Sequence, residues 1–260
     1  MTKRRRRRRR RSSAPVETRT VEVKRIPHKY ILAAFAVFIA TIGIFHAFKF
    51  TAASVSYFES KKIVDNWSNA GVVKSQNEYE IALGSINNAL FFQPEKPLYI
   101  EMYAQILEWG YLNNFANQND LRVAKTQYLL ALKSRPLWPA TYANLAMIKW
   151  RLQEFDDELR NYLIKADELG SQSQEVHLLY TRLGISLYQS NHPFYIEFKG
   201  EILARIRAGL RNPNVRPQLL AFLTETNSLK DICRWFRDYD SYTAVRHLNC
   251  KEPPTSQENI

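Results

Sequence analysis

Two aspartates near the end of the chain are the residues whose spacing most suggests chemistry. Asp238 and Asp240 form an Asp-x-Asp sequence, and two carboxylates so spaced can bind a divalent cation through oxygen. In many glycosyltransferases this pattern holds a metal ion with a sugar nucleotide. Here the pair lies in a helical segment without a preceding alternation of strands and helices, which favours a solvated helix face. A glycan-modifying enzyme using Asp238 and Asp240 is therefore only an alternative.

Other catalytic and metal-binding patterns are missing from the sequence. It contains no Gly-rich phosphate loop, no His-Glu-x-x-His and no Gly-x-Ser-x-Gly. The histidines lack the spacing of metal ligands; they are His28, His46, His177, His192 and His247. We therefore expect a protein that is not an enzyme, with no catalytic residues, no metal site, no cofactor and no small-molecule substrate.

The two cysteines, Cys233 and Cys250, report on the compartment. In an oxidising compartment this pair is expected to form a disulfide, whereas a reducing cytosol favours two free, buried thiols. The state of the pair therefore tests which side of a membrane the C-terminal region occupies.

The run from Ile31 to Phe48 is apolar enough to cross a membrane. It holds no Asp, Glu, Lys, Arg or Pro, and as a helix its length is about 27 Å, close to the thickness of a hydrocarbon core. A cleaved signal peptide is the alternative, but such apolar regions are usually shorter. We expect an uncleaved anchor, and either reading places the C-terminal region in the same compartment.

The basic charge of the chain is concentrated before this run. Residues 1–29 carry thirteen Lys or Arg against two Glu, whereas residues 59–260 hold equal numbers of basic and acidic groups. Positive residues beside a span stay cytoplasmic and attract anionic lipid headgroups. We expect a disordered cytoplasmic tail over residues 1–29, and no specific binding of nucleic acid, because the rest of the chain has no basic field.

Beyond the span the chain is expected to be all-α. Glycine is sparse and β-branched runs are few, and no helix breaker occurs between Phe48 and Gly71. The expected order is a helix over residues 30–70 that leaves the membrane, a helical repeat domain over 71–248, and a flexible tail over 249–260. The repeat domain is expected to end in capping helices, with short helices over Gln218–Asn227 and Leu229–Leu248.

A spaced string occurs twice in the repeat region. It consists of an alanine, a bulky residue four positions later, and a second alanine three positions after that. A proline follows five positions further on and ends the helix. Small alanines let two helices approach closely, and the bulky residue fills the space between them. The two copies are Ala82, Ile86, Ala89, Pro94 and Ala124, Tyr128, Ala131, Pro136, and Tyr180, Leu183 and Gly184 give the complementary pattern of a first helix.

On these residues the chain resembles the tetratricopeptide (TPR) repeat family. The resemblance implies an α-solenoid of helical hairpins, with the first helix of each pair lining a concave groove. Carried over by position, the groove residues are Trp109, Asn113, Ala143, Met147, Trp150, Thr181, Ile185 and Tyr188. Two occupants remain open for this apolar, aromatic surface: a protein partner, or the chain's own C-terminal helix.

The whole layout resembles VpsP-type polysaccharide biosynthesis proteins of the bacterial inner membrane. That resemblance implies a single-pass, membrane-anchored scaffold that binds protein partners of an envelope complex for exopolysaccharide or capsule production, with its N-terminus cytoplasmic and its C-terminal domain periplasmic. A subunit of a cell-division or secretion complex, in which the span itself pairs with other spans, is the second alternative.

Overall fold

The computed structural model describes residues 28–248 and residue 250, and this part of the chain is entirely helical, with twelve helices and no strand. The expected all-α class is therefore confirmed. The tails expected over residues 1–29 and 249–260 lie outside the described residues, apart from His28, Lys29 and Cys250. His28 and Lys29 already belong to the first helix.

Helix α1, His28–Ala70, holds the apolar run. The chain divides into two compact units, Met1–Ala47 and Phe48–Ile260, and α1 contributes to both. In the first unit, α1 is long and apolar enough to cross a membrane, as judged by length and composition. The one long helix expected from about Tyr30 to about Asn69 is present.

The second half of α1 belongs to the core of the second unit. Four of its apolar side chains are buried at helical spacing: Ala53, Tyr57, Val64 and Trp67. They pack against the first two helices that follow, α2 (Gln76–Phe92) and α3 (Pro97–Leu112). Polar contacts lie on the same face, since the buried Ser60 hydroxyl donates to the Ala82 carbonyl over 2.9 Å. This half of α1 is thus a structural element of the domain.

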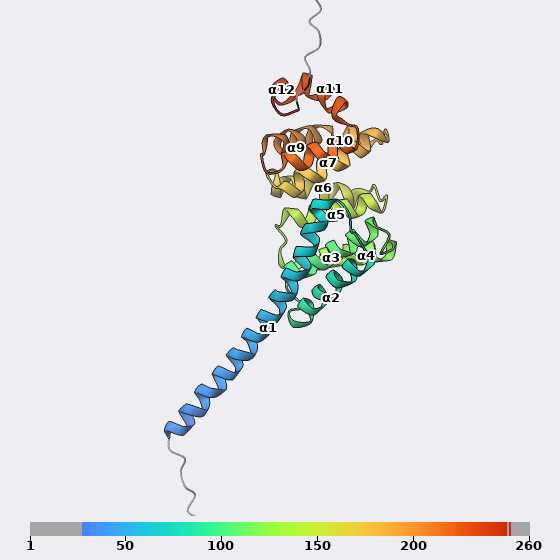
Figure 1. Ribbon diagram of the computed structural model, residues 1–260. Coiled ribbons are helices and arrows are strands. Elements are labelled where there is room, and N and C mark those ends of the chain that lie inside the picture. Colours follow the sequence, from blue (N-terminus) through green and yellow to red (C-terminus); the bar gives the residue numbers. More distant parts are fainter. Residues whose placement is uncertain (1–27, 249, 251–260) are drawn as a thin grey trace, which may run out of the picture. The chain divides into compact units, whose positions relative to one another are not determined.

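The remaining helices pack mainly on their neighbours in sequence (Figure 1). The closest pairs are α3 with α4, α5 with α6, and α7 with α9. The bounds of these helices are α4 Gln118–Ser134, α5 Pro139–Arg151, α6 Asp157–Gly170, α7 Gln174–Gln189, α8 Phe194–Glu197, α9 Lys199–Arg211, α10 Arg216–Glu225, α11 Leu229–Tyr239 and α12 Ser241–Leu248.

The residues of the repeated string occupy equivalent places in α2 and α4. Their alanines and bulky residues are fully buried, and their prolines lie in the turns after the helices; the buried ones are Ala82, Ile86, Ala89, Ala124, Tyr128 and Ala131. Tyr180, Leu183 and Gly184 of α7 are also buried. A Cβ on Gly184 would lie 2.5 Å from Cγ2 of Ile202 in α9, so only glycine permits this approach.

The C-terminal end differs from the single helix that its sequence suggests over Leu229–Leu248. The segment forms two helices, α11 and α12, which are separated at Asp240. Asp240 accepts a hydrogen bond from the Thr243 backbone N–H over 3.1 Å and so caps α12. Cys233 and Cys250 lie at disulfide distance, with their Cα atoms 5.6 Å apart.

Candidate functional site

The turn between α5 and α6 gathers charged side chains around one buried lysine. Lys149 lies in the last turn of α5, and the backbone N–H of Glu154 donates to its carbonyl over 2.9 Å. Gln153 closes the turn in a left-handed conformation, with φ of 60°. Asp156 then caps α6 by accepting from the Leu159 backbone N–H. The turn and cap therefore bring Glu154 and Asp156 toward the same lysine.

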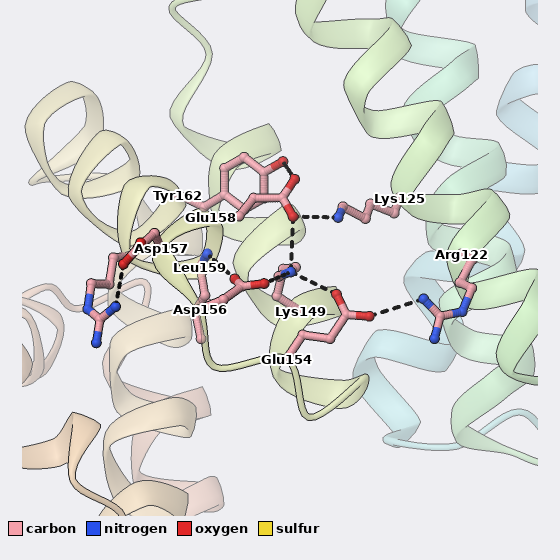
Figure 2. Close-up of polar contacts among 10 residues, drawn as sticks. Arg122, Lys125, Lys149, Glu154, Asp156, Asp157, Glu158, Leu159 and Tyr162 are labelled. Atoms are coloured by element: carbon pink, nitrogen blue, oxygen red, sulfur yellow. Dashed lines mark hydrogen bonds and ion pairs between the residues drawn. The ribbon is translucent and has the colours of Figure 1, made fainter.

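The Lys149 ammonium binds three carboxylates (Figure 2). Its Nζ lies 2.7 Å from Glu154, 2.6 Å from Asp156 and 3.0 Å from Glu158. The lysine side chain is only 2% exposed, whereas the three carboxylates are 28–53% exposed. All three N–H donors of a buried ammonium thus have acceptors, which offsets the cost of its desolvation.

Helix α4 is tied to this cluster from the other side. Lys125 lies 2.6 Å from Glu158, and Arg122 lies 3.0 Å from Glu154. The Tyr162 hydroxyl also donates to Glu158 over 2.6 Å. Figure 2 shows these side chains converging from α4, from the end of α5 and from the start of α6. The cluster therefore joins two successive helical hairpins.

The protonation states are fixed by these contacts. Burial alone would lower the pKa of Lys149, but hydrogen bonds to Asp156, Glu154 and Glu158 outweigh it and raise that pKa. Burial acts to raise the pKa of Glu158, yet hydrogen bonds from Lys125, Tyr162 and Lys149 lower it to about 2. The lysine stays charged and the carboxylate ionised, so neither is poised as an acid, base or nucleophile near neutral pH.

The same three carboxylates are the one group of the described residues that could hold a metal ion. Glu154, Asp156 and Glu158 each offer an oxygen within 4.8 Å of the others. The Lys149 ammonium already contacts all three. A metal ion would have to displace this buried cation, so the arrangement fits a structural ion-pair cluster better than a metal centre.

Two buried glutamates on α3 make a second set of links between hairpins. Glu101 pairs with Arg135 and accepts from the Thr141 hydroxyl. Glu108 pairs with Arg151 and accepts from the Tyr128 hydroxyl over 2.5 Å. One helix is thereby bonded to the two that follow it. These contacts also serve structure.

The sequence-predicted groove residues fall into two groups. Ala143, Met147, Thr181 and Ile185 are buried, with exposed fractions of 8% or less. Trp109, Asn113, Trp150 and Tyr188 are half-buried. The structure therefore does not bring the eight together as one open surface.

Other parts of the same chain cover both ends of this set. At one end the ring of Trp109 lies beside that of Trp67 in α1, with centroids 6.2 Å apart, and Asn113 accepts from the Val73 backbone N–H over 3.0 Å. At the other end Tyr188 meets Trp235 of α11, with ring centroids 4.7 Å apart. Trp150, the remaining half-buried residue, packs partly against the hydrophobic core.

The aspartates considered as a metal pair do not act together. Asp240 binds Arg211 over 2.6 Å and accepts from both the backbone and the hydroxyl of Thr243. Burial acts to raise the pKa of Asp240, but these hydrogen bonds from Thr243 lower it. Asp238 is exposed. Asp240 thus has a structural role as a helix cap, and nothing aligns Asp238 beside it.

Sequence reasoning missed the Lys149 cluster altogether. The acidic run Glu154 to Glu158 reads as a solvated face, and no motif marks the one lysine that is buried beneath it. No protein-family model and no curated protein sequence matches this chain.

Proposed function

We propose that this protein is a non-catalytic scaffold, anchored in the bacterial inner membrane by one span, whose helical domain lies in the periplasm and binds proteins of an envelope assembly. The TPR-like pattern and the basic tail, single span and late cysteine pair favour an assembly that makes or exports exopolysaccharide or capsule.

One observation carries this proposal: α1 contains both the candidate span and a segment of the domain core. The apolar run ends at Phe48, and the same helix buries Tyr57, Val64 and Trp67 in the core of the domain. The domain is thus built directly on the segment that is apolar enough to cross a membrane. This continuity supports a domain that is held close to a membrane, as the proposed scaffold requires.

Only part of the predicted groove is left for a protein partner. Tyr188 and Trp109 are in contact with α11 and α1, so the chain itself fills those ends. Trp150 remains half-buried, and Leu137 and Trp138, in the turn before α5, are 75% and 47% exposed. Aromatic residues with an accessible face are frequent anchors of protein interfaces.

Photocrosslinking in native membranes tests the proposal. A photoreactive residue in place of Trp150 or Trp138 is expected to capture a specific envelope protein, whereas one in place of Tyr188 captures the chain's own α11. The exposed Ile164 is the matched control and is expected to capture no discrete partner. If Trp150 and Trp138 give the same pattern as Ile164, these surfaces bind no partner.

Two further variants separate the alternatives. Exchange of Ile31–Phe48 for an unrelated span preserves a scaffold's activity, but abolishes that of a subunit whose span pairs with other spans. Asp238→Ala with Asp240→Asn leaves polymer production unchanged if the protein is not a glycan-modifying enzyme.

A further inference from the structure

The corner between α2 and α3 presents an exposed aromatic ring to its surroundings. Phe91, in the last turn of α2, is 80% exposed. Its neighbour Phe92 is half-buried, and the rings of Phe92 and Phe48 meet edge to face with centroids 6.3 Å apart. The Phe91 ring meets that of Phe92 edge to face, with centroids 5.3 Å apart, and most of its surface is left exposed as an apolar patch.

The second copy of the repeated string has no aromatic ring at the position of Phe91, whereas Phe92 also packs against the core. Aligned on the two copies of the string, Phe91 corresponds to Lys133 and Phe92 to Ser134. Both residues of the second copy are exposed at the end of α4. The same helix end is therefore built with a charged and a small polar residue in one repeat and with two aromatic rings in the other.

The contact with Phe48 supplies the reason for this difference. Phe48 is the last residue of the apolar run and is itself 62% exposed, and Lys49 follows it. A segment of this kind leaves the hydrocarbon at about this residue, and aromatic side chains are enriched at that depth. Phe92 thus contacts α1 at the last residue of the apolar run, where the proposed span would leave the lipid.

We propose that the α2–α3 corner is a second membrane contact, in which Phe91 enters the lipid headgroup region beside the point where α1 emerges. The inference rests on the membrane anchoring proposed above. The proposed occupant is lipid, because Phe91 adjoins Phe92 and Phe92 contacts the exposed Phe48, which ends the run that would lie in the bilayer. The corner thereby fixes the orientation of the scaffold at the bilayer.

The test places a fluorescent label at single cysteines in the full-length protein, reconstituted in bilayers of phosphatidylcholine and phosphatidylglycerol. Because the only native cysteines are the Cys233–Cys250 pair, unreduced wild-type protein serves as the blank. The labelled variants are Phe91→Cys, the equivalent Lys133→Cys as the matched control, and Ile39→Cys within the apolar run. The probe is a nitrobenzoxadiazole dye, and the quencher is a nitroxide on the lipid acyl chain. Circular dichroism confirms that each variant is folded.

Quenching at positions 91 and 39 together with none at 133 is the expected result. Quenching at 39 but not at 91 overturns the membrane contact while leaving the anchor intact, and a blue-shifted but unquenched label at 91 assigns the corner to a protein surface instead. Equal quenching at 91 and 133 overturns a contact specific to this corner. No quenching at 39 overturns the anchoring and the inference together.

Discussion

Tyr188 of α7 and Trp235 of α11 meet edge to face, with ring centroids 4.7 Å apart, and the Tyr188 hydroxyl accepts from Arg234 over 2.7 Å. Tyr195 packs against the same indole, at 5.5 Å. For the Tyr188 end of the predicted groove, where a partner and the chain's own C-terminal helix were both open, the occupant is therefore α11 of the same chain. A helical repeat array needs such a cover, because its last unit otherwise exposes an apolar face.

Removal of the Trp235 ring is expected to destabilise the domain. Trp235→Ala loses two aromatic contacts and part of its apolar burial, which we estimate to lower the free energy of unfolding by about 2 kcal/mol. Urea unfolding followed by circular dichroism measures the change. Leu137→Ala, at a 75% exposed position, is the control and is expected to change stability by less than about 0.5 kcal/mol. Equal midpoints for the two variants would show that α11 does not stabilise the repeat.

Lys149 is expected to be the most sensitive member of the charged cluster. Lys149→Met leaves three carboxylates close together without their shared cation, and removing one partner of a buried pair costs several kcal/mol. Because the carboxylates are 28–53% exposed, water screens their repulsion, and we expect a loss of about 2 kcal/mol. Lys165→Met removes a lysine from an exposed pair with Glu168 and controls for the loss of a surface charge. Unfolding free energies that agree for both variants would contradict a structural role for the cluster.

The Lys149 cluster also predicts that the protein becomes less stable at acidic pH. The pKa of Glu158 is lowered from 4.5 to about 2, and hydrogen bonds donated by Lys149 are the main cause that lowers the pKa values of Glu154 and Asp156. A carboxylate with a lower pKa in the folded state stabilises the protein fully above its unfolded pKa, and this contribution is lost as the pH falls toward the folded value. We therefore expect the unfolding free energy to decrease from about pH 4.5 toward about pH 2.

Substitution of Glu158 tests whether the cluster causes this loss of stability at acidic pH. Glu158→Gln is expected to flatten the decrease in unfolding free energy below about pH 4.5, as measured by urea unfolding at a series of pH values. Glu80→Gln, on an exposed part of α2, is the matched control and is expected to keep the wild-type profile. A wild-type slope in Glu158→Gln would assign the acid sensitivity to other groups.

The cysteine pair connects stability with topology. Its two residues are 17 positions apart, and closing a loop of this size stabilises a protein by about 3 kcal/mol in the chain-entropy model. Reduction is expected to lower the unfolding free energy by about that amount, with the Cys233→Ser, Cys250→Ser double variant as the unresponsive control. In native membranes both thiols are expected to react with maleimide only after reduction. Free thiols there would contradict the periplasmic assignment.

Local sequence features predicted the fold better than they predicted surfaces. The Ala82–Ile86–Ala89 spacing indicates buried helix positions, because close helix packing needs small side chains at fixed intervals. The break at Asp240 was missed, since an aspartate within a helical pattern is compatible with either a helix interior or a cap. The covering of Tyr188 by Trp235 depends on residues 47 positions apart in the sequence, and no local pattern encodes such a pairing. Lys149 differs, since the carboxylates that bind it lie only five to nine positions away, but no motif marks this lysine as the buried one.

A pair of glycine variants tests the close approach of α7 and α9. Gly184→Ala would place a Cβ 2.5 Å from Cγ2 of Ile202, and such overpacking is expected to cost about 1–3 kcal/mol. Gly84 lies within α2 and has no atom within 4 Å of the position of its Cβ, so Gly84→Ala is expected to stabilise the protein by up to about 1 kcal/mol through helix propensity. The midpoint temperature of thermal unfolding should therefore fall for Gly184→Ala and rise for Gly84→Ala. A Gly184→Ala protein as stable as Gly84→Ala would show that the helices can separate without loss, and that α7 and α9 are not held by the contact at Ile202.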